Sequence, residues 1–258
     1  MTATARPTAT GTTSAIPLGP PGPALEVAEL GQSEPQLLCM MVVQRPDRMA
    51  GHRDNPLFAL YADGRVIFTP RGSGKRPGQQ AQLGADGAEA LARKLATRGF
   101  ADLPHEIGAR GRFAYEAIEI VMRYDQRWKR VVAQWGPDLP PAFMATLKQI
   151  KAFDHPSAEP WQPDQILAMF SMATGKAPAV PWPADLPSPA GGINVIKGFG
   201  SLRLDAEHEP TVRALVDAGK PVRVERRAYQ LTYSRVPPEL ETLNAVRRAF
   251  IQWRADQD

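Results

Sequence analysis

The stretch that decides the fold reads RAYQLTY at residues 227–233, VPP at residues 236–238, and then a helical run that ends at Phe250. The first part alternates in the way a half-buried strand does. The Pro-Pro step suits the start of a helix, because proline in the first turn lacks only an N–H that would have no intrahelical partner. The apolar residues after it recur at helical spacing, so we expect a strand followed by an amphipathic helix with Phe250 in the core.

The same order of features occurs earlier in the chain. RWKRVVAQW fills residues 127–135, LPP follows at 139–141, and a helical run ends at Phe153. The sequence therefore predicts an α+β fold with two similar βββαββα units, each an antiparallel sheet with helices on one face. Segments 139–153 and 236–250 share only four of fifteen residues, so this internal repeat is a hypothesis that depends on the matching order of elements.

Composition divides the chain into an arm and two bodies. Residues 1–35 are expected to form an extended or disordered arm, because their first 24 are mostly Thr, Ala, Pro and Gly and bury too little apolar surface to offset the entropy of ordering. Residues 36–154 hold the first unit and residues 155–163 a linker. Residues 164–258 hold the second unit, with a proline-rich loop at 173–190.

Two strand patterns stand out in the first unit. Apolar runs on either side of Asp63-Gly64 predict a hairpin with a type I′ turn, since that turn requires positive φ. Residues 115–124 alternate, with Ile118, Ile120 and Met122 on one face and Glu119 on the other, which predicts a strand that is buried on one face only.

Charge and hydropathy exclude several classes of protein. The net charge is +4, and no block of like charges demands a nucleic-acid partner, although one is not excluded. The longest apolar run, residues 37–43, is too short for a membrane span. The single cysteine, Cys39, excludes an internal disulfide and is expected in the core. As written, the chain is expected in the cytoplasm; the alternative is an exported protein whose leader has been removed.

Residues 71–76, RGSGKR, follow a strand and could cradle a phosphate. A P-loop would require Gly at position 69 and Ser or Thr at position 76, where this chain has Thr69 and Arg76. We therefore interpret the segment as a solvated basic loop that could contact a partner.

No residues are nominated for catalysis, for a cofactor or for a metal. The four histidines have no metal-ligand spacing, no Gly-x-Ser-x-Gly elbow is present, and no pair of carboxylates suits acid–base work. These patterns favour a protein that is not an enzyme.

A basic sheet face is a further hypothesis. It would combine arginines at 223, 226 and 227 with Lys129 and Arg130, and Trp128 and Tyr229 would be its stacking aromatics. The alternative is a solvated strand face whose long side chains cover apolar surface.

The favoured function is a non-catalytic binding or assembly protein, an accessory subunit that contacts protein partners through its arm and sheet faces. One alternative is a small-ligand-binding protein or enzyme with a pocket between the two units, and a second is a weak nucleic-acid binder. The sequence does not determine the oligomeric state. The residues proposed for partner binding are Leu25, Val27, Leu30, Arg71, Lys75, Arg76 and Trp182.

Overall fold

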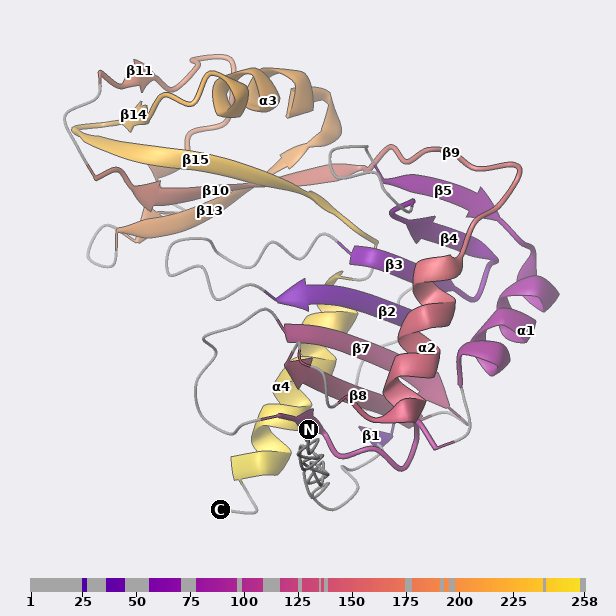
Figure 1. Ribbon diagram of the computed structural model, residues 1–258. Coiled ribbons are helices and arrows are strands. Elements are labelled where there is room, and N and C mark those ends of the chain that lie inside the picture. Colours follow the sequence, from indigo (N-terminus) through magenta and orange to yellow (C-terminus); the bar gives the residue numbers. More distant parts are fainter. Residues whose placement is uncertain are drawn as a thin grey trace, which may run out of the picture.

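The computed structural model describes residues 25–26, 36–44, 56–70, 78–96, 99–108, 117–124, 127–134, 136, 139–174, 178–190, 193–194, 198–238 and 240–255. These residues form a mixed α+β protein with two sheets (Figure 1). The predicted α+β class is confirmed. The internal repeat is not confirmed, for reasons that lie in the strand pairing and in the place of the last helix.

The first sheet has nine strands within the described residues. They are β1 (Leu25–Glu26), β2 (Leu37–Gln44), β3 (Pro56–Tyr61), β4 (Arg65–Phe68), β5 (Gln79–Gln82), β6 (Glu106–Ile107), β7 (Ala117–Tyr124), β8 (Arg127–Gln134) and β9 (Glu159–Pro160). Their order is β1-β8-β7-β2-β3-β4-β5-β9, and β6 pairs with β8 in parallel. Helices α1 (Ala85–Leu95) and α2 (Pro141–Ala152) cover one face.

The second sheet is smaller and has the order β11-β14-β15-β10-β13-β12. Its strands are β10 (Gln165–Met172), β11 (Val180–Pro181), β12 (Ile193–Asn194), β13 (Phe199–Asp205), β14 (Val222–Val224) and β15 (Arg227–Val236). A short 3₁₀ turn, η3 (Ala206–His208), leads into α3 (Glu209–Asp217), which packs on this sheet. Helix α4 (Leu240–Ala255) ends the described chain.

Strand β2 is central in the first sheet, between β7 and β3, and both its faces are buried. Cys39 and Met41 join the core under α1 and α2, whereas Met40 and Val42 join the core on the opposite face. The predicted burial of Cys39 is confirmed, and desolvation raises the pKa of its thiol well above the usual value.

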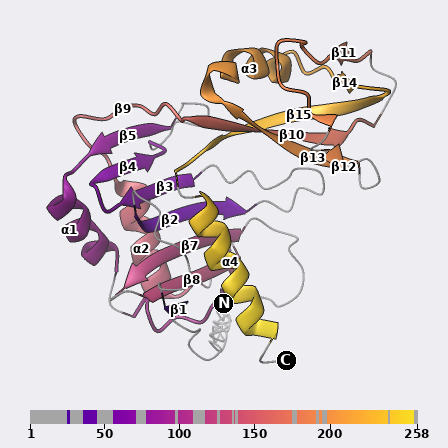
Figure 2. The same cartoon turned by 180° about the vertical axis from the view of Figure 1, so that it is seen from behind.

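Helix α4 follows β15 of the second sheet but packs on the first sheet (Figure 2). Leu243, Val246 and Phe250 are fully buried there, so the predicted core position of Phe250 is confirmed. The expectation of helices on one face is wrong for this sheet, because α1 and α2 cover one face and α4 the other. Strand β7 is therefore buried on both faces rather than on one. The predicted domain boundaries stay a prediction.

The two sheets also differ in pairing. In the first, β2 pairs with β7, the earlier strand of the β7–β8 hairpin. In the second, β10 pairs with β15, the later strand of the β14–β15 hairpin. A duplicated unit would keep the equivalent neighbour, so the shared element order does not correspond to a shared sheet order.

The hairpin at Asp63-Gly64 forms, but not with the predicted two-residue type I′ turn. Three residues separate β3 from β4, and only Gly64 among them has positive φ, at 93°. The Arg65 N–H donates to Asp63 Oδ1 at 2.9 Å. Gly64 lies against the backbone of Gly84, where an added Cβ would approach Gly84 N to 2.4 Å.

Gly64→Ala should therefore destabilise the protein by about 1–3 kcal/mol from the backbone strain alone, with a further loss from the contact with Gly84. Urea unfolding measures the change. Gly136→Ala is the matched control, because its added Cβ meets no atom within 4 Å. Equal effects of the two substitutions would contradict the role given to Gly64.

Candidate binding groove

An apolar groove of about 780 Å³ lies beside α2, over the ends of the central strands of the first sheet. Its floor contains Met41, Leu147 and Ile150, each at most 4 % exposed. Met144 stands at the side with 41 % of its surface exposed, although it is a large apolar side chain. The described lining residues are Met41, Leu57, Thr69, Pro70, Pro141, Met144, Ala145, Leu147, Lys148, Ile150 and Lys151.

Local features of the sequence create this groove. Between β2 and β3 the register shifts, so that Met41 pairs with Phe58 and Val42 with Pro56, which leaves Leu57 without an opposite residue. Such a bulge changes the direction of side chains, and Leu57 lines the groove. Thr146, on the opposite side of α2, donates to the Leu95 carbonyl of α1 at 3.0 Å and fixes the rotation of the helix.

The charged residues of the groove lie towards one end of α2. Pro141 and Met144 lie in the first turn, and Lys148 and Lys151 in the last turns. Both lysines are exposed, and no acidic residue occurs among the described lining residues. The groove is therefore apolar along most of its length and cationic at the C-terminal end of the helix.

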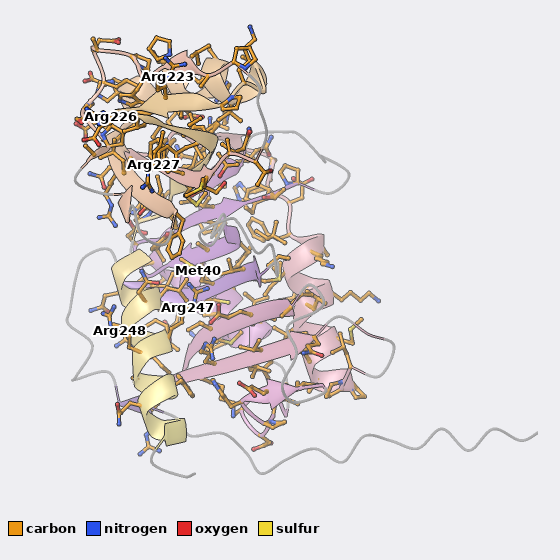
Figure 3. All side chains as sticks on the ribbon, turned by 90° about the vertical axis from the view of Figure 1, so that its left-hand side faces the viewer. Met40, Arg223, Arg226, Arg227, Arg247 and Arg248 are labelled. Atoms are coloured by element: carbon orange, nitrogen blue, oxygen red, sulfur yellow. The ribbon has the colours of Figure 1, made fainter. Side chains whose placement is uncertain are left out.

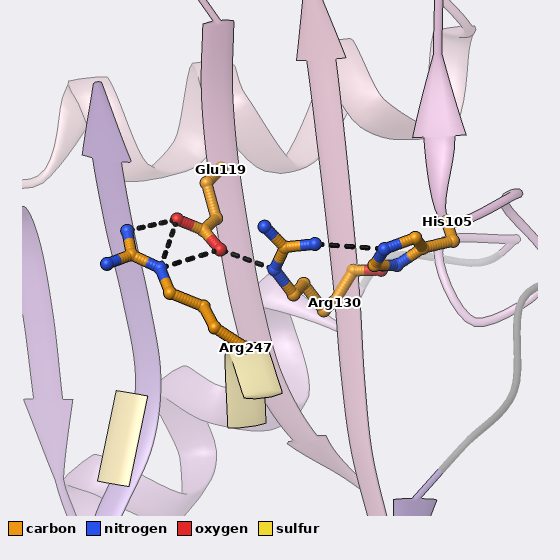
Figure 4. A network of polar contacts seen from close by, with 4 residues as sticks. All are labelled: His105, Glu119, Arg130 and Arg247. Carbon is orange, nitrogen blue, oxygen red and sulfur yellow. Dashed lines mark hydrogen bonds and ion pairs between the residues drawn. The ribbon is translucent and has the colours of Figure 1, made fainter. Parts of the chain in front are cut away.

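A buried charge network lies on the other face of the sheet (Figure 4). Glu119 of β7 is fully buried, and its carboxylate accepts from Arg130 Nε at 2.5 Å. It also accepts from Arg247 of α4, through Nε at 3.0 Å and through Nη2. Burial alone would raise the pKa of Glu119, but the hydrogen bonds and charges of the two arginines lower it to about 2.

His105 extends this network. Arg130 Nη1 donates to His105 Nε2 at 2.9 Å, and the Arg130 carbonyl accepts from Nδ1 at 3.2 Å. Because a guanidinium can only donate, Nε2 must be unprotonated and the imidazole neutral. Burial, together with the charge of Arg130, lowers the pKa of His105 to about 4. The ring stacks on Phe250 with centroids 4.6 Å apart.

These contacts assign the network a structural role. Glu119 stays ionised and His105 neutral near pH 7, and both are held by hydrogen bonds within the protein. Glu209 of α3 is held similarly, since it accepts from Arg213, Arg235 and Tyr233. In the described part of the chain, no three His, Cys, Asp or Glu side chains gather as metal ligands would.

Most of the residues proposed for partner binding lie outside the described residues: Val27, Leu30, Arg71, Lys75 and Arg76. Leu25 belongs to β1 and pairs with Trp128 at the edge of the first sheet. Trp182 packs edge-on against Phe170 at 5.3 Å, and its Nε1 donates to the Pro187 carbonyl. The structure therefore does not bring Leu25 and Trp182 together, and each lies on a different sheet.

The hypothesis of a single basic face is wrong. Trp128 and Tyr229 are each 2 % exposed, so neither can stack on a base. Lys129 is buried and donates to the Leu103 carbonyl, and Arg130 is bound to Glu119.

The arginines labelled in Figure 3 do not form one patch. Arg223, Arg226 and Arg227 lie at the β14–β15 end of the second sheet, whereas Arg248 lies on α4. Arg247, its neighbour in the sequence, points instead to Glu119.

Sequence reasoning missed both the groove and the Glu119 network. The groove depends on a register shift that has no sequence signature here. The network had one signal: Glu119 alternates with apolar residues in a strand, and Arg247 lies beside the apolar stripe of the last helix.

No family model, curated protein or solved structure matches this chain. In the described residues, no helix has both the length and the apolar character needed to cross a membrane.

Glu119→Gln should lower the free energy of unfolding by about 3–5 kcal/mol, because it leaves the guanidinium groups of Arg130 and Arg247 partly buried without a counter-charge. Urea unfolding measures this loss. Glu89→Gln is the control: its pair with Arg93 is exposed, so the change should stay within about 1 kcal/mol. A loss no larger than the control would show that the network does not hold α4.

Stability should also fall as the pH drops from 7.5 to 4.5, because His105 binds a proton in the unfolded chain below pH 6.5 but in the folded protein only near pH 4. His105 should contribute roughly 2–3 kcal/mol to this loss in the free energy of unfolding. The stabilisation from ionised Glu119 is lost at lower pH, as the pH falls from about 4.5 to 2. In His105→Phe, the free energy of unfolding measured by urea titration should fall by roughly 2–3 kcal/mol less between pH 7.5 and 4.5. The same fall as in the wild type would contradict the role given to His105.

Proposed function

We propose that this chain is a binding protein without acid–base catalysis at its described residues. The observation that supports this most is the contrast between two kinds of site. The buried side chains of Glu119, His105 and Glu209 are held by hydrogen bonds to arginines, whereas the groove exposes Met144 above a buried apolar floor. Apolar grooves that end in a few polar groups are the usual form of a binding site.

In the first form of the proposal, the chain is an accessory subunit that contacts a protein partner through its arm and sheet faces. The supporting observation is that Leu25–Glu26 joins the outer edge of the first sheet by pairing with β8. An arm that leaves from a sheet edge can reach a neighbouring protein, and segments that order on a partner can cover a large surface.

In the second form, the chain binds a small molecule. The volume of the groove supports this form, because sites for small ligands usually measure roughly 300–1,000 Å³. The sequence predicts a pocket between the two units, but this groove lies on the first sheet alone. Its described lining comes from the first sheet, from the residues that follow β4, and from α2.

Filling the groove tests the proposal. In Ala145→Trp, an exposed lining residue gains a large ring that should occupy the groove. We expect this variant to lose the species that co-purifies with the wild type from the native source, identified by mass spectrometry. Ala152→Trp is the matched control, since Ala152 is an exposed residue of the same helix outside the described lining.

Deletion of residues 1–24 tests the accessory-subunit form separately. It should abolish co-purification of a protein partner and leave the melting temperature of the isolated chain unchanged. Retention of all bound species by both variants would refute the binding proposal.

A further inference from the structure

We propose that the groove on α2 binds a free aliphatic monocarboxylate, with its chain along the helix and its carboxylate at Lys148 and Lys151. This inference rests on the proposed binding function and adds the class of ligand. It depends on the shape of the groove and on the distribution of charge along it.

The shape suits a single extended chain. The lining residues of α2 run from Pro141 to Lys151, which is about 15 Å along a helix that rises 1.5 Å per residue. Met41, Leu147 and Ile150 form a buried apolar floor beside the helix. A long aliphatic chain would cover that floor and the exposed side of Met144, and would remove apolar surface from water on both molecules.

The charge distribution selects the head group. Lys148 and Lys151 are one helical turn apart at one end, whereas Pro141 and Met144 make the opposite end apolar. An anion with one head group and one chain matches this separation of charge from apolar surface. A cationic amphiphile would place like charges together, and an uncharged chain would gain nothing from the lysines.

Titration calorimetry of the full chain with dodecanoate, below its micelle concentration, tests the inference. We expect one site per chain, and an affinity that rises from octanoate to dodecanoate by up to about fourfold per buried methylene. Dodecyltrimethylammonium, which has the same chain and the opposite charge, should bind more weakly. Ala145→Trp should weaken dodecanoate binding about tenfold or more, and Ala152→Trp should not.

The head group is tested with Lys148→Glu/Lys151→Glu, which should remove the preference for dodecanoate over dodecyltrimethylammonium. Lys94→Glu on α1 is the matched control, because Lys94 is an exposed lysine outside the described lining. Equal binding of the two amphiphiles by the wild type, or equal effects of the two lysine variants, would overturn the inference.

Two further outcomes separate the inference from the proposed function. If dodecanoate does not bind but Ala145→Trp still abolishes co-purification, the ligand class is wrong and the groove remains a binding surface, occupied by a protein partner. If phosphatidylglycerol vesicles bind while free dodecanoate does not, the ligand is a lipid surface and the inference fails. If Ala145→Trp changes neither measurement, both proposals fail.

Discussion

The buried carboxylate of Glu119 is the constraint on which the arrangement of the two sheets depends. It is fully buried between Ala117 and Val121 on one face of β7, where an unpaired charge would cost several kcal/mol or more. Arg130 from the neighbouring strand supplies one counter-charge, and Arg247 supplies the other from 128 residues away. The C-terminal helix must therefore return to the first sheet, and Leu243, Val246 and Phe250 are buried when it does.

That return links the second sheet to the first. Strand β15 belongs to the second sheet, yet the chain beyond it continues into α4 on the first. Two hydrogen bonds secure the connection: Tyr61 of β3 donates to the Pro238 carbonyl, and Arg235 of β15 donates to the Trp161 carbonyl. Loss of the Glu119 contact would thus release the helix that ties the end of β15 to the larger sheet.

Local patterns could be predicted from the sequence, whereas contacts between distant segments could not. The alternation in residues 115–124 predicts Ile118, Ile120 and Met122 on one face correctly, and helical spacing predicts Phe250 in the core correctly. Neither pattern says which sheet a helix covers, so alternation alone predicts a half-buried strand with Glu119 on its exposed face. The groove could not be predicted either, because it arises where a register shift leaves Leu57 unpaired.

Two helices, α2 and α4, follow a Pro-Pro step. Equivalent positions in them carry different residues because the helices pack against different surfaces. When the two Pro-Pro steps are aligned, Ile150 of α2 corresponds to Arg247 of α4, and both point inward. Ile150 packs in the apolar core beneath α2, whereas Arg247 pairs with Glu119, so the charge of Arg247 is neutralised inside the fold. The cations of the groove, Lys148 and Lys151, face solvent instead. A charged side chain beside exposed apolar surface can contact a ligand, whereas one that is paired inside the core cannot. We therefore propose the binding site at α2.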